Sequence, residues 1–148
     1  FELRTMIEAT VAELAARRRS DADIAAMRDA LRRMDEALTS EQDGSESDDD
    51  FHLAIAAATH NQYVLRLAEF LGRQFSESRR LAWVGHPRGM ESPREAQREH
   101  FALLDAIAAG DPAAARAAAH VHLRGAAERV GIDLPADLGG GVAVDLPR

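Results

Sequence analysis

The sequence predicts a single all-α domain, an antiparallel bundle of about six helices. Apolar residues recur at steps of three and four along most of the chain, which is the spacing of one face of a helix. Helix-capping residues stand directly before several of these apolar runs. No run alternates apolar and polar residues as a strand would. With 148 residues, of which 46% are hydrophobic and 29% charged, the chain is long enough to bury one core.

The first helix is expected over residues 2–18 and the second from about residue 20. The apolar stripe that should face inward from the first helix consists of Leu3, Met6, Ile7, Val11 and Leu14. Ser20 and Asp23 have the spacing of a capping box, which opens the second helix. That helix carries a regular bundle seam, formed by Ile24, Met27, Leu31, Met34 and Leu38.

The third and fourth helices follow a polar break at residues 40–47. The third, expected over residues 48–59, is apolar over most of its surface and should therefore lie in the middle of the bundle. Asn61 opens the fourth helix, whose inward side chains should be Val64, Leu67, Ala68, Leu71 and Phe75. Glycine and proline within residues 83–90 predict a loop.

The fifth helix has the strongest start signal of the chain. Ser92 is expected at the N-cap, Pro93 at the first helical position, and Glu95 as the capping-box acid. Its inner face should be Leu103, Leu104 and Ile107. Gly110 ends it, and Asp111 with Pro112 starts a sixth helix that reaches about residue 130. The chain is thus expected to divide into a helical domain at 1–130 and a mobile tail at 131–148.

Composition excludes several classes of function. Cysteine is absent, so disulfides, thiolate metal sites and cysteine nucleophiles are excluded. A net charge of −7 argues against direct binding of duplex DNA, because that affinity comes mainly from Lys and Arg on phosphates. No apolar run reaches the roughly 18 residues of a membrane span, and no signal peptide is visible, so a cytoplasmic location is expected.

Four side chains are candidate metal ligands. Asp48 lies four residues before His52, so on a helix the two stack one turn apart and can chelate one cation. His100 shares the inner face of the fifth helix, and His122 shares a face with small alanines of the sixth. Three imidazoles in one apolar interior are costly unless each has a partner. Either a shared cation or separate hydrogen-bond partners would provide one.

The other three histidines fit ordinary positions. His120 lies on a different face from His122, aligned with two arginines, and is expected to be exposed to solvent. His60 follows the third helix, where it can interact with the last carbonyls. His86 lies in the predicted loop, where a surface position is expected.

Several short elements occur in a fixed order along the chain. An Arg precedes a Glu by four residues, and paired alanines follow (Arg4, Glu8, Ala15-Ala16). An Asp-x-x-Phe-His element and an Ala-x-x-x-Asn step come next (Asp48 to His52, Ala57 to Asn61). The closing element comprises Glu99-His100, Leu104, Ala106-Ile107, Gly110-Asp111, Ala115 and His122-Leu123. Over residues 1–130 this ordered set resembles the C-terminal effector domain of the FadR subfamily of GntR-type bacterial transcription regulators.

The resemblance implies a metal centre. In many members of that family an Asp and three His bind one divalent metal in a cavity at the centre of the bundle, which here implies Asp48, His52, His100 and His122 as ligands. Four such ligands close a tetrahedral zinc site, whereas an octahedral metal keeps two positions open. Zinc is preferred on this basis, and nickel, iron and manganese are compatible with the same ligands.

The resemblance also implies what the domain does. Family members sense small carboxylates and similar metabolites, form dimers, and bind operator DNA through an N-terminal winged helix-turn-helix that this chain does not contain. A guanidinium forks onto a carboxylate, so arginines should anchor the effector. Arg4 is expected from its position in the family pattern, and Arg79 because it continues the inner face of the fourth helix. The expected function is regulatory, not enzymatic.

Three other hypotheses can be weighed against this one. A metal-dependent hydrolase would need a base to activate water, and Glu99 is expected on a face next to that of His100. A dimerisation bundle without metal would use the same helices for packing alone. A di-iron centre would need two Glu-x-x-His pairs. The residues three before His52 and His100 are Asp49 and Gln97, so this pattern is missing.

Overall fold

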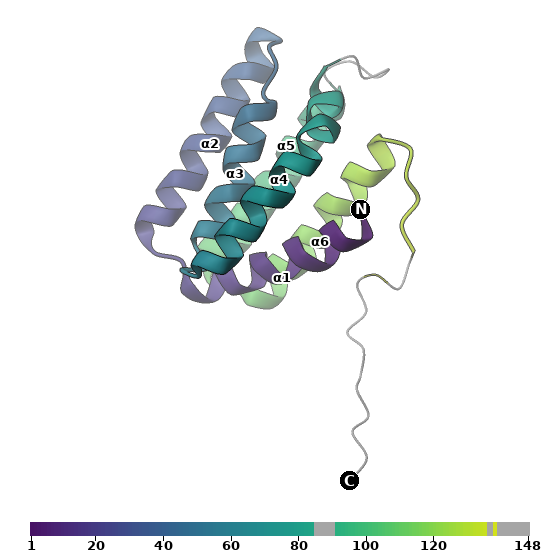
Figure 1. Ribbon diagram of the computed structural model, residues 1–148. Helices are drawn as coiled ribbons and strands as arrows, with labels where there is room; N and C mark the ends of the chain where they lie inside the picture. Colours follow the sequence, from purple (N-terminus) through teal and green to yellow (C-terminus); the bar gives the residue numbers. More distant parts are fainter. Residues whose placement is uncertain (85–90, 136–137, 139–148) are drawn as a thin grey trace.

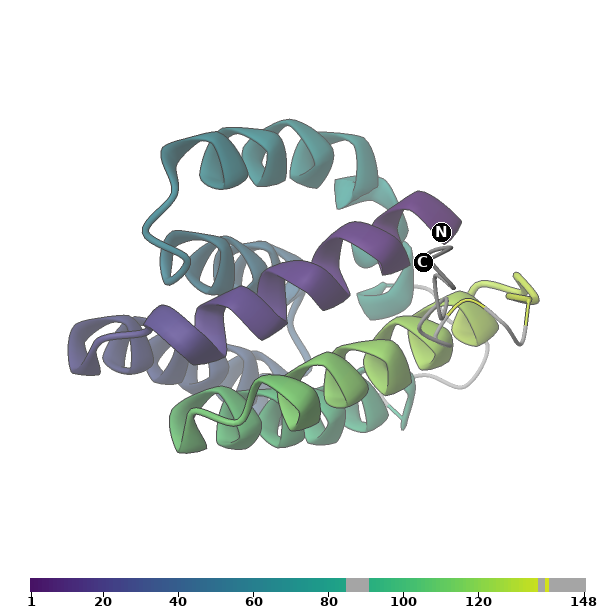
Figure 2. The same cartoon turned by 90° about the horizontal axis from the view of Figure 1, so that it is seen from below.

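The computed structural model describes residues 1–84, 91–135 and 138, and this part of the chain folds into six helices. Their bounds are α1 Glu2–Arg18, α2 Asp21–Ser40, α3 Ser45–Ala57, α4 Gln62–Trp83, α5 Glu91–Ala109 and α6 Pro112–Arg129. No strand occurs within these described ranges. Helices α2 to α5 run side by side, and α1 pairs with α6 and crosses them obliquely (Figures 1 and 2). The predicted all-α bundle is confirmed.

Three of the predicted helix starts are confirmed at the level of hydrogen bonds. Ser20 and Asp23 form a complete capping box, in which the Ser20 backbone N–H donates to the Asp23 carboxylate at 2.7 Å. Asn61 accepts from the backbone N–H of Tyr63 at 3.0 Å at the start of α4. Asp111 does the same for Ala114 at 3.0 Å at the start of α6.

Two helices begin earlier than the sequence predicts. The Asp43 carboxylate accepts from the backbone N–H of Ser45 at 2.9 Å, so α3 starts within the segment expected to be a polar break. Helix α5 begins at Glu91, which places Ser92 inside its first turn and not at the N-cap. Ser92 is fully buried there, and its hydroxyl makes no capping hydrogen bond to the described residues.

The inner face of α1 is the main error of the sequence prediction. Leu3 and Met6 are 57% and 58% exposed, and the residues that α1 buries are mostly alanines. These are Ala9, Ala12, Ala15 and Ala16. Short side chains allow α1 to pack closely against α6, which contributes buried alanines of its own at 115 and 119. In α4, Leu67 was likewise expected inside and is 44% exposed.

The core is built around α2, α3 and α5. The predicted seam of α2 is buried throughout, from Ile24 to Leu38. Helix α3 lies between α2 and α4, as its apolar surface predicts, and buries Phe51 completely (Figure 1). Leu103, Leu104 and Ile107 of α5 are buried as predicted. This packing holds α3, α5 and α6 in a fixed relation to one another.

Two predicted segments lie largely outside the described residues. Helix α4 ends at Trp83, where the loop at 83–90 was expected to begin, and residues 85–90 are not described. Most of the predicted tail at 131–148 is not described either. In the part of the chain that the structure covers, no helix is both long enough and apolar enough to cross a membrane.

Gly44 lies where a side chain would collide with the Trp83 ring. A Cβ atom at this position would lie 2.7 Å from two carbons of the Trp83 ring, which is far inside normal contact. We expect Gly44→Ala to lower the free energy of unfolding by about 1–3 kcal/mol, as overpacking does in other cores. Urea unfolding followed by circular dichroism measures this.

Gly72→Ala is the matched control, because nothing lies within 4 Å of a Cβ placed in that helix interior. It should gain about 0.5–1 kcal/mol from helix propensity. Equal stability of Gly44→Ala and the unaltered chain would contradict the packing of Trp83 on Gly44.

Candidate functional site

Three histidines from three helices converge in the interior. His52 of α3, His100 of α5 and His122 of α6 each offer a ring nitrogen, and the three nitrogens lie within 4.8 Å of one another. The ring centroids of His100 and His122 are 4.4 Å apart. His100 and His122 are buried, and the His52 side chain is 10% exposed. The structure thus brings together the three imidazoles that the sequence places on inner faces.

Asp48 completes the group. Its Oδ1 lies 3.3 Å from Nε2 of His52 and 3.8 Å from Nε2 of His100. The indole N–H of Trp83 donates to its other oxygen at 3.2 Å, which fixes the orientation of the carboxylate. All four predicted ligands therefore meet at one place.

The protonation states suit a cation. Burial lowers the pKa of His100 well below its ordinary value and also lowers the pKa of His122, so both rings are neutral near pH 7. Burial alone would raise the pKa of Asp48, but its interactions with the neighbouring imidazoles of His100 and His52 and with the Arg79 guanidinium outweigh it and hold that pKa well below its ordinary value. Neutral imidazoles beside an ionised carboxylate are the forms in which these groups bind metals.

The inward ring nitrogens form no hydrogen bond in the described part of the chain, and Asp48 is the acidic group nearest to those of His52 and His100. Both ring nitrogens of His100 and the Nε2 atoms of His52 and His122 are buried and make no hydrogen bond to the described residues. Buried polar atoms are nearly always paired, so such a cluster calls for a further partner. Three nitrogens and one carboxylate oxygen form a donor set that fits zinc, nickel, iron or manganese. The residues therefore fit the metal that the family resemblance implies.

Carboxylates behind two of the histidines fix their orientation. Nδ1 of His52 lies 3.2 Å from Oε2 of Glu8, and Arg4 holds Glu8 at 2.7 Å. Nδ1 of His122 is hydrogen-bonded to Oε2 of Glu99 at 3.0 Å. A carboxylate can only accept, so the His122 ring carries its proton on Nδ1 and presents the lone pair of Nε2 to the cluster. His52 has a carboxylate near each ring nitrogen, Glu8 at Nδ1 and Asp48 at Nε2.

The second of these carboxylates is itself clamped by an arginine. Arg129 donates to both oxygens of Glu99, at 2.8 and 2.7 Å, which is the bidentate geometry of a strong pair. Gly125 makes room for it, because a Cβ there would lie 2.6 Å from the Glu99 carboxylate. The sequence predicted no role for Glu8 or Glu99 as partners of the histidines. The four-residue spacing of Arg4 and Glu8 was visible, but no pattern in the sequence pairs either carboxylate with a histidine of another helix.

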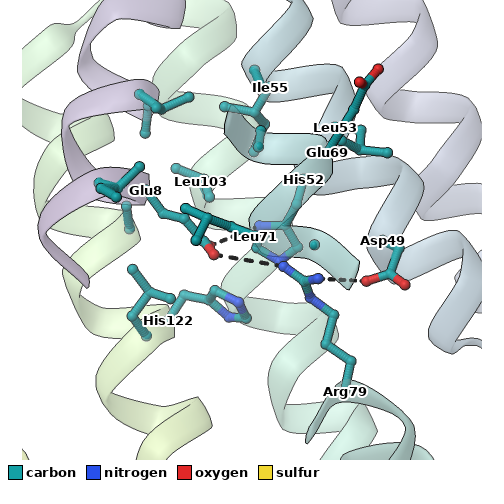
Figure 3. A pocket seen from close by; sticks show the side chains of 18 of the residues that line it. Glu8, Asp49, His52, Leu53, Ile55, Glu69, Leu71, Arg79, Leu103 and His122 are labelled. Carbon is teal, nitrogen blue, oxygen red and sulfur yellow. Dashed lines mark hydrogen bonds and ion pairs between the residues drawn. The ribbon is translucent and has the colours of Figure 1, made fainter. Parts of the chain in front are cut away.

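A cavity of about 350 Å³ adjoins the cluster. His52 and His122 form part of its wall, and Arg79 of α4 reaches into it beside them (Figure 3). Helices α1, α3, α4, α5 and α6 all contribute to the lining. Its size is within the usual range for small-molecule sites.

Arg79 is the cavity's buried cation. It forms an ion pair with Asp49 and lies 3.6 Å from Glu8 and 3.7 Å from Asp48 (Figure 3). Burial would lower the pKa of Arg79, but these acidic neighbours outweigh it and raise that pKa, so the side chain is charged. Burial raises the pKa of Asp49 despite its contact with Arg79.

Arg4, the other predicted effector anchor, has a different position. It is 2% exposed and is not among the residues that line the cavity. Its guanidinium pairs with Glu8 and lies 5.5 Å from the centre of the Phe75 ring. In this structure Arg4 supports Glu8 and does not face the cavity.

The remaining histidines lie away from the cluster. His60 is exposed, and its Nε2 pairs with Asp23 at 2.9 Å, so its partner is a side chain and not the carbonyls expected from sequence. His120 was expected to be exposed, but it is half-buried, and burial lowers its pKa. His86 lies outside the described residues.

Comparison with known proteins decides the family. The FCD domain model matches residues 1–125, which is most of the chain. The chain belongs to the FCD domain family. This is the C-terminal effector-binding domain of GntR-family regulators, so the family resemblance noted in the sequence is confirmed.

The curated relatives are transcription regulators. The HTH-type transcriptional regulator LutR of Bacillus subtilis is 33% identical over 127 residues, covering 83% of this chain and 57% of that protein. The Uxu operon transcriptional regulator of Escherichia coli is 33% identical over 138 residues, covering 88% of this chain and 53% of that protein. The chain thus spans about half the length of these relatives. Their family is regulatory and not enzymatic, as expected.

Solved structures agree on the fold. Streptococcus agalactiae GntR superposes with a TM-score of 0.72 at 20% identity, covering 88% of this chain and 56% of that one. E. coli McbR/YncC gives a TM-score of 0.72 at 18% identity, covering 87% of this chain and 61% of that one. At these identities the likeness establishes the helical architecture alone.

Glu99 should tune metal affinity through His122. Glu99→Gln keeps the shape of the side chain but removes the carboxylate that fixes the His122 tautomer. We expect the affinity for Zn²⁺ to fall about 10- to 100-fold, as with other partners of metal-bound histidines. Competition with a chromophoric chelator measures it.

Glu128→Gln is the control, because it makes the same chemical change at an exposed residue of α6. It should leave the affinity unchanged. An unchanged affinity in Glu99→Gln as well would show that Glu99 does not orient a metal ligand.

Proposed function

We propose that this domain senses a small carboxylate with the help of one bound divalent metal, and that it passes the signal to an N-terminal DNA-binding domain. The observation that carries the proposal is the cluster of unpartnered imidazole nitrogens at the wall of a cavity that also holds a buried arginine. With a metal bound at the cluster, the site would offer an anion two positive groups, the metal and Arg79. The family match supports a regulatory role for the site.

The proposed ligands are Asp48, His52, His100 and His122. Three neutral imidazoles and one carboxylate leave a divalent metal with a net local charge of about +1, so the metal attracts an anionic effector as a Lewis acid. Zinc is our first choice, and nickel, iron or manganese fit the same donor set. His52 and His122 are kept in ligating orientation by Glu8 and Glu99.

Arg79 is the proposed anchor for the effector carboxylate. Its guanidinium already lies among acidic groups, of which Asp49 is the most exposed, with a side chain 29% accessible. An effector carboxylate can take the place of Asp49 on this guanidinium, because both offer the same two acceptor oxygens. Arg4 enters the proposal through Glu8, which it holds beside His52 and Arg79.

The signal can leave the cavity through α1 and α4. Glu8 of α1 contacts His52 of α3 and lies 3.6 Å from Arg79 of α4, so three helices share one charged network. An effector that binds Arg79 weakens its ion pairs with Asp49 and Glu8 and so shifts the packing of α4 against α1 and α3. We propose that the whole protein acts as a homodimer in the cytoplasm, where such a shift re-aims two operator-binding domains.

Metal binding can be read from Trp83, the single tryptophan of the chain. Because its indole donates to Asp48, Ni²⁺ at the proposed site should quench its fluorescence with a stoichiometry of one ion per chain. His100→Ala should abolish saturable quenching. His60→Ala, which removes an exposed histidine, should not change it.

Two outcomes would favour a metal-free dimerisation bundle. One is quenching that persists in His100→Ala, and the other is protein that neither retains a metal after purification without added ions nor binds one afterwards. Size measurement by light scattering on the same samples separates dimer formation from metal binding.

Effector binding should depend on Arg79. We expect Arg79→Gln to weaken binding of short carboxylates to the Zn²⁺-loaded chain at least tenfold, because a hydrogen bond to a charged partner contributes about 1.5–3 kcal/mol. Isothermal calorimetry with acetate, butyrate and succinate measures this. Arg80→Gln changes the exposed neighbouring arginine and should have no effect.

The Arg79 proposal fails if both variants bind these acids equally well. If neither they nor the unaltered chain bind any carboxylate, the sensing proposal itself fails.

A further inference from the structure

The cavity is polar at one end and apolar elsewhere. His52, His122 and Arg79 lie together at the polar end (Figure 3). Glu8 belongs to the polar end as well, where Arg4 holds it beside Arg79. The walls beyond them are aliphatic, with contributions from α1, α3, α4 and α5 that include Ile7, Val11, Ile55, Leu71 and Leu103. A ligand held by its carboxylate at the polar end must therefore place its remaining atoms against these side chains.

The other polar residues of the lining are paired with neighbours or exposed. The Ser76 hydroxyl donates to the backbone carbonyl of Arg73 in its own helix, at 3.1 Å. Glu69 and Arg73 are exposed, and Figure 3 shows the Glu69 carboxylate turned away from Arg79. Asp49 is paired with Arg79. Among the described lining residues, no free hydroxyl or amide group faces the aliphatic walls.

Because the aliphatic walls offer no hydrogen-bond partner, the cavity should distinguish aliphatic acids from polyhydroxylated acids. A hydroxyl group moved from water to an aliphatic wall loses its hydrogen bonds and gains none, whereas a methylene group gains from leaving water. A site that recognises hydroxyl groups must supply polar partners for them. The walls of this cavity supply none in the described part of the chain.

We propose that the effector is a carboxylate with an aliphatic body and not a polyhydroxylated acid, an inference that rests on the proposed sensing function. The carboxylate head binds at Arg79 and the histidine cluster, and the body fills the space between α1, α3 and α4.

A chain-length series tests the class of ligand. Acetate, butyrate and hexanoate are titrated into the Zn²⁺-loaded chain by calorimetry, with gluconate as the six-carbon polyhydroxylated acid. Affinity should rise about fourfold for each added methylene group, because each contributes about 0.8 kcal/mol when buried. Gluconate should bind at least tenfold more weakly than hexanoate.

A variant tests whether the aliphatic wall is responsible. Val11→Thr keeps the shape of a wall residue but adds a hydroxyl group. It should weaken hexanoate binding about three- to tenfold and leave acetate binding within twofold. Val121→Thr, made at a position 64% exposed on α6, is the matched control and should change neither.

The outcomes separate this inference from the proposed function. Gluconate binding as tightly as hexanoate, or an affinity that stays flat from acetate to hexanoate, overturns the aliphatic class and leaves carboxylate sensing in place. Equal effects of Val11→Thr and Val121→Thr on hexanoate also overturn it. If acetate, butyrate, hexanoate and gluconate all fail to bind, both proposals are wrong.

Discussion

Three imidazole rings lie together in the largely buried interior, where a polar atom is costly unless it finds a partner. Glu8 and Glu99 meet the requirement for one edge of His52 and His122, and arginines hold both carboxylates in place. The opposite edges then have to point at one another and at Asp48. The inward convergence of the nitrogens is thus a consequence of the outer carboxylates as much as of the helices that carry the histidines.

The same charged groups connect the cluster to the cavity. Glu8 contacts His52 on one side and lies near Arg79 on the other, while Asp48 faces both the imidazoles and Arg79. An anion that enters the cavity therefore meets an Arg79 guanidinium that is already surrounded by acidic groups, and it must displace one of them to bind there. Under the proposed function, this would couple occupancy of the cavity to α1, α3 and α4.

The close approach of α1 and α6 depends on small side chains. Alanines fill the contact, and the larger apolar residues of α1, such as Leu3 and Met6, lie on the outside. Larger side chains in the contact would move α6 outward and carry His122 away from His52 and His100. The alanine-rich composition of these helices, which by itself says little about function, therefore sets the dimensions of the histidine cluster.

The sequence by itself determined the elements. Hydrophobic periodicity and capping residues predicted six helices with close bounds, because both signals are local, and face arguments with the family pattern identified Asp48 and the three histidines. Only the tertiary structure decided which groups meet across helices. It showed that alanines and not Leu3 and Met6 face inward from α1, that Arg4 serves Glu8 while Arg79 reaches the cavity, and that Glu99 faces His122. These contacts join residues up to dozens of positions apart, and their geometry depends on how the helices pack, which local sequence does not encode.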